Sequence, residues 1–216
     1  SASTHARLFA LQRLVDVVLH NVNRMPALWP ILQGHLAEVV DNESPTVRAA
    51  ALEAFDRAVA GAIAVCRRVP VAEQQGEPFE VVILRPLEQL NRSYYDDVRL
   101  GALRVLSHAL QRVGDSLTVG WHPVLAMLTA VAAPEAEGGH REPEAALLGV
   151  AFQSVQMIAQ DYMGTVPEDG LYACVRLAAT YAAQKVDLNI SLTAIGLMWN
   201  MADFFGRTIN ALLLMS

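Results

Sequence analysis

Histidines, cysteines and paired carboxylates are the side chains most often used for protein chemistry, and this chain spaces them widely. Its six histidines are His5, His20, His35, His108, His122 and His140. No two of them have the i, i+4 spacing with an intervening glutamate that a zinc-protease helix requires. The two cysteines, Cys66 and Cys174, have no second cysteine or histidine at metal-ligand spacing. We therefore expect no metal site, no cofactor and two small buried thiols.

The remaining candidates for chemistry are two acidic pairs, Asp96/Asp97 and Glu135/Glu137. Either pair has the residue types for general acid–base catalysis, but a helix cap explains the first and a solvated loop the second. The chain has no glycine-rich phosphate loop, no dinucleotide-binding glycine motif and no Gly-x-Ser-x-Gly nucleophile elbow. Lys185 is the only lysine, which removes the usual Schiff-base candidates. The sequence thus predicts a protein that is not an enzyme.

The amino-acid composition limits the possible fold and partners of the protein further. Hydrophobic residues make up 53% of the 216 residues and charged residues 18%, which favours helices buried on more than one side. The net charge of −6, with no basic stripe, argues against a nucleic-acid partner. The longest runs without charge are 116–134, 145–160 and 188–202, and we interpret all three as buried helices. We therefore predict no transmembrane segment.

An internal repeat shows which elements must position these residues. An alanine followed by an apolar residue recurs four times, each time with apolar residues four positions before and after the alanine. The pairs are Ala51-Leu52, Ala102-Leu103, Ala151-Phe152 and Ala194-Ile195. The small residue lets two helices approach closely, and its neighbours one turn away fill the core stripe. Another apolar helical segment precedes each pair, so the predicted unit is helix A, turn, helix B.

A repeat of this length, built from two helices, is typical of HEAT and armadillo arrays. We predict an all-α, HEAT/armadillo-like, right-handed solenoid of about four helical-hairpin repeats plus one leading helix, with essentially no sheet. The expected elements of this single domain, 1–216, are a leading helix at 4–22, repeats at 26–66, 79–113, 121–162 and 168–206, and the start of a further helix at 207–216. Since such repeats bury their faces only against neighbours, we expect a fragment of a longer solenoid. An irregular helical bundle with chance matches is the alternative.

The most specific string runs from Leu188 through Ala194-Ile195-Gly196-Leu197-Met198-Trp199 to Asn200, followed by Asp203-Phe204-Phe205. It resembles the monensin-sensitivity protein two family, large proteins similar to the Arf exchange factors of the BIG type. Other stretches resemble the family in the same order, from about Leu14 to Phe205. They include Leu28-Trp29 with His35-Leu36, Gly114-Asp115-Ser116-Leu117 with Gly120-Trp121, and Ala151-Phe152-Gln153.

The resemblance implies a segment of the helical region of a cytoplasmic scaffold, peripheral at trans-Golgi network and endosome membranes. It implies protein partners, namely Dopey-type scaffolds, Arf-like GTPases or a second copy of the chain. These proteins resemble exchange factors but lack the catalytic Sec-seven domain, so no catalytic residue carries over. The alternative function is a peripheral membrane-lipid binding module, against which the negative charge and the single adjacent basic pair, Arg67-Arg68, both argue.

Five polar residues within the family-like string are the candidates for partner binding: Asn189, Ser191, Thr193, Asn200 and Asp203. Helix caps and core hydrogen bonds are one interpretation of them, and an exposed docking surface is the other. Gly196 lies among them, and we expect its missing side chain to let helix A of the same repeat pack closely.

Overall fold

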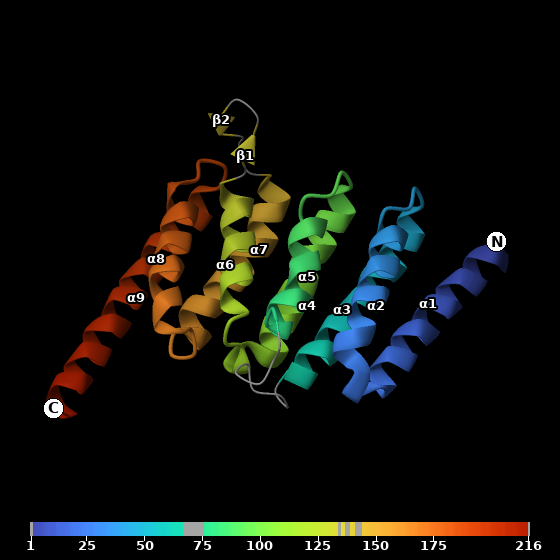
Figure 1. Ribbon diagram of the computed structural model, residues 1–216. Coiled ribbons are helices and arrows are strands. Elements are labelled where there is room, and N and C mark those ends of the chain that lie inside the picture. Colours follow the sequence, from blue (N-terminus) through green and yellow to red (C-terminus); the bar gives the residue numbers. More distant parts are fainter. Residues whose placement is uncertain (1, 67–75, 134, 137–138, 141–143, 216) are drawn as a thin grey trace. The chain divides into compact units, whose positions relative to one another are not determined.

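The computed structural model describes all residues except 1, 67–75, 134, 137–138, 141–143 and 216 (Figure 1). Nine α-helices fill most of that described part. They are α1 (Ala2–His20), α2 (Met25–Val40), α3 (Pro45–Cys66), α4 (Phe79–Leu90), α5 (Asp96–Val113), α6 (Trp121–Ala132), α7 (Ala145–Met157), α8 (Glu168–Ala183) and α9 (Leu188–Met215). Short 3-10 turns span Val22–Arg24 and Gly114–Ser116, and a π-helical turn follows α7 at Ile158–Tyr162. The all-α prediction is confirmed.

A small hairpin departs from the helical pattern. The strands β1 (Glu135–Ala136) and β2 (Gly139–His140) pair antiparallel, with Glu135 opposite His140. They lie in the polar spacer between α6 and α7, and they form the one sheet found within the described ranges. The expectation of essentially no sheet therefore holds apart from these two-residue strands.

The helices form two compact units, of which the first spans Ser1–Pro123. Within it, α3 packs against α1 on one side and α5 on the other, while α2 and α4 lie against these helices as a second layer (Figure 1). Trp29 of α2 is fully buried, and its indole nitrogen donates to the carbonyl oxygen of Val82 in α4 at 3.3 Å. Its ring meets Phe79 edge-on, with 6.5 Å between centroids. These contacts of Trp29 join α2 to α4 within the second layer.

The second unit spans Val124–Ser216, and α8 and α9 form its most extensive helix pair. Tyr181 of α8 is fully buried and stacks on Phe152 of α7 at 5.5 Å between centroids. Its hydroxyl donates to the carbonyl oxygen of Leu128 in α6 at 3.0 Å. Burial raises the pKa of Tyr181 well above its usual value of 10, so the phenol remains a hydrogen-bond donor.

Two helix limits differ from the prediction. The leading helix, expected at 4–22, runs from Ala2 to His20, and a separate 3-10 turn follows it. The further helix expected to begin at 207 is absent, because α9 continues unbroken for 28 residues to Met215. No proline interrupts α9, and its two glycines, Gly196 and Gly206, each cost a helix only about 1 kcal/mol. The number of repeats and their assembly into one domain stay predictions.

Candidate functional site

Among the residues whose side chains are described, the candidates for chemistry lie apart from one another. Within the described part of the chain, no three His, Cys, Asp or Glu side chains are grouped so as to hold a metal ion. Burial raises the pKa of the Cys66 thiol to about 12, with a contribution from the charge of Glu80, and that of Cys174 to about 11. Both groups are therefore protonated at neutral pH and are poor nucleophiles.

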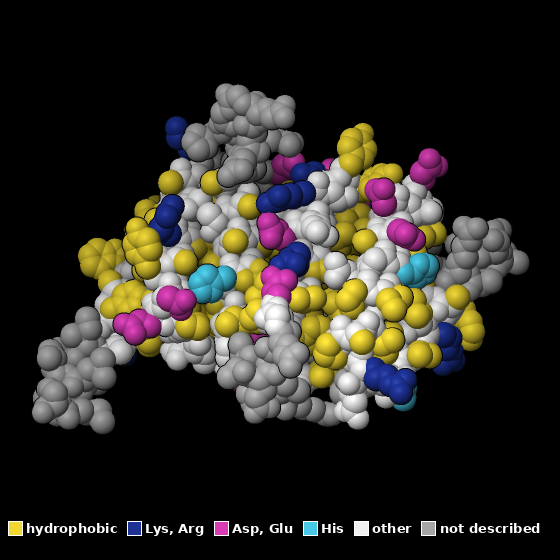
Figure 2. Space-filling view, viewed as in Figure 1, with side chains coloured by type: hydrophobic (Ala, Val, Ile, Leu, Met, Phe, Trp, Pro, Cys, Tyr) yellow, Lys and Arg dark blue, Asp and Glu magenta, His cyan; other side chains and the backbone are white. Residues whose placement is uncertain are grey.

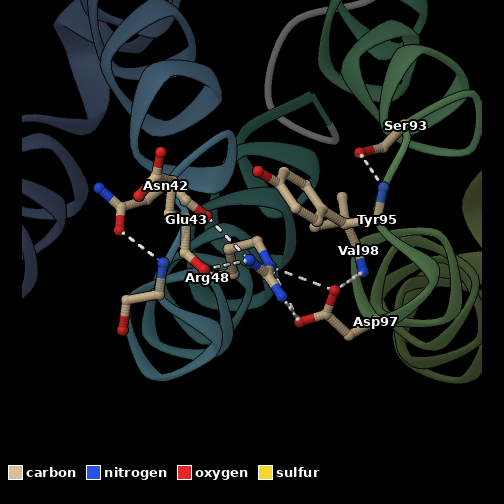
Figure 3. A network of polar contacts seen from close by, with 8 residues as sticks. Asn42, Glu43, Arg48, Ser93, Tyr95, Asp97 and Val98 are labelled. Atoms are coloured by element: carbon tan, nitrogen blue, oxygen red, sulfur yellow. Dashed lines mark hydrogen bonds and ion pairs between the residues drawn. The ribbon is translucent and has the colours of Figure 1, made fainter.

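The acidic residue Asp97 belongs to a buried clamp centred on Arg48 (Figure 3). Arg48 lies near the start of α3, and the residue is only 6% exposed. Its Nε donates to both carboxylate oxygens of Asp97, at 2.9 and 3.1 Å, and its Nη2 lies 2.9 Å from Asp97 Oδ2. Its Nη1 donates to the carbonyl oxygens of Asn42 and Glu43, each at 2.9 Å. The guanidinium also stacks 4.0 Å above the ring of Tyr95.

These contacts make the Arg48 clamp a structural device. One bidentate guanidinium ties the turn before α3 to the first turn of α5. Asp97 also accepts a hydrogen bond from its neighbour's amide, Val98 N, at 3.1 Å, so it contributes to the start of α5 as well as to the clamp. The donors of Arg48 and the carboxylate of Asp97 are thus bonded to groups of the protein itself.

The second buried charge, Glu80 of α4, has a similar structural role. Its carboxylate accepts hydrogen bonds from the backbone nitrogens of Thr118 at 3.0 Å and Gly120 at 2.8 Å, and from the Thr118 hydroxyl at 3.2 Å. These donors immediately precede α6, so Glu80 acts as a cap supplied from a distant helix. Of the other acidic pair, Glu137 lies outside the described residues, and for Glu135 only the backbone strand is described.

The partner-binding candidates lie on α9, whose first turn is fixed by a hydrogen-bonded clip. Asp187 Oδ1 accepts from the amides of Asn189 at 2.8 Å and Ile190 at 3.1 Å, as an N-cap does. The Gln184 amide nitrogen donates to Ser191 Oγ at 2.8 Å, and Ser191 Oγ donates back to the Gln184 carbonyl oxygen at 2.9 Å. Gln184 and Ser191 are buried, so Ser191 is a structural residue rather than a docking one.

The other four candidates form an exposed polar row: Asn189, Thr193, Asn200 and Asp203. Their spacing of four, seven and three residues places them along one side of the helix. Asp203 pairs with Arg207 one turn further on, also at the surface. Because Asp187 and Gln184 fix the start of α9, the polar row stands on a rigid support. Sequence reasoning missed both of those residues, although an aspartate directly before an apolar helical run is a known start signal.

Beside the polar row runs a second exposed feature, which we call the apolar stripe: Leu188, Leu192, Ile195 and Trp199. Their exposed fractions are 72%, 58%, 45% and 75%. Hydrophobic side chains reach the surface over the region of α8 and α9 in Figure 2. The 4-3-4 spacing was present in the sequence, where the whole run 188–202 was interpreted as a buried helix.

Gly196 lies on the open side of α9, so the expectation that it lets helix A pack closely is wrong. The residue is exposed, and a Cβ added there would meet nothing within 4 Å. The packed face is the one that carries Ala194, Leu197 and Met201, all buried. Gly196 stands two residues after Ala194, about 200° around the helix, which explains the difference.

No helix in the described part of the chain is both long and apolar enough to cross a membrane. Paired helices, buried charges that are bonded within the protein and one helix with two exposed faces define a protein of the helical-hairpin class.

Comparison with known proteins agrees with this class and makes it specific. The family model described as the C-terminal region of Mon2 protein matches residues 160–213, which include α8 and nearly all of α9. The chain is 33% identical to the MON2 homolog of Xenopus laevis and 32% identical to that of Drosophila melanogaster. These matches cover 94% and 98% of this chain, and 11% and 12% of the relatives. The chain is thus related to a segment of the MON2 proteins, which confirms the resemblance found in its motifs.

A more distant relative is the brefeldin A-inhibited guanine nucleotide-exchange protein 1 of Arabidopsis thaliana. It is 23% identical over 91% of this chain, and the match covers 12% of that protein. The chain therefore spans only about an eighth of the length of the curated relatives that it matches.

Proposed function

We propose that this chain is a non-catalytic scaffold segment of a membrane-trafficking protein. The observation that carries the proposal is the relationship to the MON2 proteins over 94–98% of the chain, with a guanine nucleotide-exchange protein among the more distant relatives. The full protein would be cytoplasmic and would associate peripherally with trans-Golgi network and endosome membranes. Its segment here would provide surface for protein partners.

Within the segment, the polar row of α9 is the proposed docking surface. Its amide, hydroxyl and carboxylate groups are exposed, and the clip of Gln184, Asp187 and Ser191 holds the helix beneath them. A rigid row of this kind keeps the entropy cost of binding low, because few groups must be ordered when the partner docks. The proposed partner is a Dopey-type scaffold or an Arf-like GTPase, and self-association is the further option.

The test measures binding of full-length protein to a purified Dopey-type scaffold and, separately, to a purified Arf-like GTPase. A variant carrying Asn189→Arg, Thr193→Arg and Asn200→Arg places three long charged side chains on the polar row without touching the core. We expect at least about tenfold weaker binding to one of the two partners, because bulk and charge at the centre of an interface are poorly tolerated.

A matched control adds the same charge elsewhere. The control replaces three exposed amides on other helices: Gln89→Arg, Gln111→Arg and Gln153→Arg. It therefore adds the same positive charge to the surface as the variant of the polar row. Wild-type affinity in this control, together with unchanged circular dichroism in both variants, assigns the loss to the polar row. Wild-type binding by the row variant to both partners contradicts the proposed docking surface.

The lipid-binding alternative predicts a different result. On the face shown in Figure 2, Lys and Arg side chains are scattered among Asp and Glu rather than gathered into a patch. Binding to acidic membranes by charge needs clustered basic residues. Flotation of the chain with phosphatidylserine vesicles separates the two functions: strong flotation that salt abolishes supports the lipid module and contradicts a purely protein-binding role.

A further inference from the structure

The apolar stripe of α9 needs an explanation that the polar row does not provide. It exposes two leucines, an isoleucine and a tryptophan in succession, and Trp199 alone is 75% exposed. A continuous apolar face of this kind on a soluble helix marks a surface that another element covers. The 4-3-4 spacing is the one by which one helix receives another.

The internal repeat shows which face this is. With Ala51 of α3 aligned to Ala194 of α9, Leu52 corresponds to Ile195 and Asp56 corresponds to Trp199. Both of these α3 side chains face α5, the next helix in the same layer. Leu52 packs so closely on α5 that a Cβ added at Gly101 would lie 2.5 Å from its Cδ1 atom. Asp56 lies 3.3 Å from His108 Nδ1 and 3.7 Å from Arg112 Nη2.

The same arrangement occurs one step earlier in the first unit. Leu19 of α1 packs onto Gly61 of α3, where an added Cβ would clash with its side chain. Asp16 of α1 pairs with Arg57 of α3 at 2.6 Å. At both steps, one helix presents an aliphatic side chain and an acidic side chain to the next. The next helix receives the aliphatic side chain at a glycine and the acid at basic groups.

We propose that the apolar stripe of α9 is a seam for the next helical hairpin of a longer polypeptide, one helix of which lies along α9 as α5 lies along α3. The chain matches only 11–12% of the length of the MON2 relatives, so most of each relative lies outside the matched segment. The covering helix carries a glycine or alanine opposite Ile195, as Gly101 stands opposite Leu52. Opposite Trp199 it carries apolar residues, because a tryptophan replaces the acid that meets His108 and Arg112 in the earlier seam.

The seam is separate from the proposed docking surface. Asn189, Thr193 and Asn200 each stand one residue after a member of the stripe, about 100° further around the helix, whereas Asp203 stands about one turn beyond Trp199 at the end of the stripe. A hairpin that covers the stripe therefore leaves the polar row open to a partner. Loss of the seam and loss of partner binding are consequently caused by different substitutions on α9.

The experiment labels single cysteines with N-ethylmaleimide and locates the label by mass spectrometry. Leu192→Cys lies on the stripe and Thr193→Cys on the polar row, at neighbouring positions that are both exposed. Each is prepared in the 216-residue chain and in the full-length protein. In the short chain both cysteines should label rapidly. In the full-length protein we expect Leu192→Cys to label at least about tenfold more slowly, because burial protects the site, while Thr193→Cys keeps its rate.

Two results overturn the proposal. One is rapid labelling of Leu192→Cys in the full-length protein, which shows that no following hairpin covers the stripe. The other is protection of Leu192→Cys in the short chain that grows with protein concentration, which shows that the occupant is a second copy. Iodide quenching of tryptophan fluorescence gives an independent measure, since Trp29 and Trp121 are buried and Trp199 alone is exposed. In each protein the Trp199 contribution is the difference in quenching between the wild type and Trp199→Phe, and it should be large in the short chain and small in the full-length protein.

Discussion

Two faces of the molecule occupy equivalent positions in the repeat: the face of α3 that carries Leu52 and Asp56, and the face of α9 that carries Ile195 and Trp199. The first is covered by α5, and its contacts are both apolar and ionic. The second is exposed, and all four residues of its stripe are apolar. Aligned positions of two helices are thus covered by a neighbouring helix in α3 and open to solvent in α9.

The polar groups around the two helices differ in the same way. Near α3, the polar side chains are tied to other helices: Arg48 reaches the start of α5, and Asp56 pairs with His108 and Arg112. On α9, the one exposed ion pair, Asp203 with Arg207, joins residues of the same helix. A side chain bonded across a seam supports the fold, whereas a polar row bonded to nothing beyond its own helix is available to a partner. Substitutions in these two regions should therefore differ in their effects on stability.

The largest expected effect is at the Arg48 clamp. Arg48→Ala leaves the carboxylate of Asp97 and the carbonyl oxygens of Asn42 and Glu43 without their donor. Since hydrogen bonds to charged groups are strong and the buried Arg48 side chain also packs on Tyr95, we expect a loss of about 3 kcal/mol in the free energy of unfolding. Urea unfolding followed by tryptophan fluorescence measures it, with Trp199→Phe as the background so that the signal comes from the first unit.

The companion variants are Arg48→Lys and Asn200→Ala. Lysine keeps the charge but cannot reproduce the two-pronged contact, so it should recover only part of the lost stability. Asn200→Ala lies on the exposed polar row and should change stability by less than about 0.5 kcal/mol. Equal losses from Arg48→Ala and Asn200→Ala would remove the distinction between the two helices.

Glycines provide the second test. Gly101→Leu forces a side chain against Leu52 in the covered seam and should cost about 1–3 kcal/mol through overpacking. Gly196→Leu on α9 has open space around it and removes the helix penalty of glycine, so it should raise stability by up to about 1 kcal/mol. Thermal melts of the two variants should therefore shift in opposite directions. If Gly196→Leu lowers the melting temperature, position 196 packs against another helix and does not lie on the open side of α9.

A smaller effect should distinguish the buried from the exposed partner-binding candidates of α9. Ser191→Ala removes the hydrogen bonds between its hydroxyl and Gln184, while the Gln184 amide keeps its 2.5 Å bond to the carbonyl oxygen of Asp187. We expect a loss of about 1 kcal/mol, the usual net value of an intramolecular hydrogen bond. Thr193→Ala, two residues away and exposed, should be close to neutral. Chemical denaturation of the second unit, followed by Trp199 emission, compares them.

The helical class was predictable because it depends on local periodicity. Apolar residues at 3.6-residue spacing and the recurring alanine pairs indicate paired helices without any long-range information. The burial of Ser191 was accessible in the same way, since it lies three residues before Ala194 on the packed face. Gly196 was misinterpreted because its small size was considered before its position around the helix. The same check would have placed it on the open side.

The polar contacts between distant helices were not predictable from local spacing. Arg48 and Asp97 stand 49 residues apart, and Glu80 caps residues 38 and 40 positions away. Such pairs depend on which helix ends the fold brings together, and no pattern within one helix specifies that. The start of α9 is an intermediate case. Asp187 is a recognisable cap, but the part played by Gln184 depends on the shape of the turn between α8 and α9.

The smallest effect concerns the first seam, where Asp16 of α1 meets Arg57 of α3. The hydrogen bond from Arg57 lowers the pKa of Asp16 below its usual 3.8, and the positive charges of Arg57, Arg13 and His20 act in the same direction, against a smaller opposing contribution from desolvation. A carboxyl group whose pKa is lowered by folding stabilises the folded state when ionised. Its contribution is therefore complete well above pH 3.8 and is lost as the pH falls through the lower, folded-state pKa.

Asp16→Asn should accordingly lower the melting temperature slightly at neutral pH, and the difference from the wild type should shrink as the pH falls below 3.8. The pair lies at the surface, where solvent screens it, so the shift at neutral pH is expected to be the smallest of the four. Arg57→Gln removes the other half of the pair and should give the same pH profile, and the double variant should add nothing to either single one. A difference between Asp16→Asn and wild type that stays constant across this pH range would mean that packing, rather than the ion pair, holds α1 against α3.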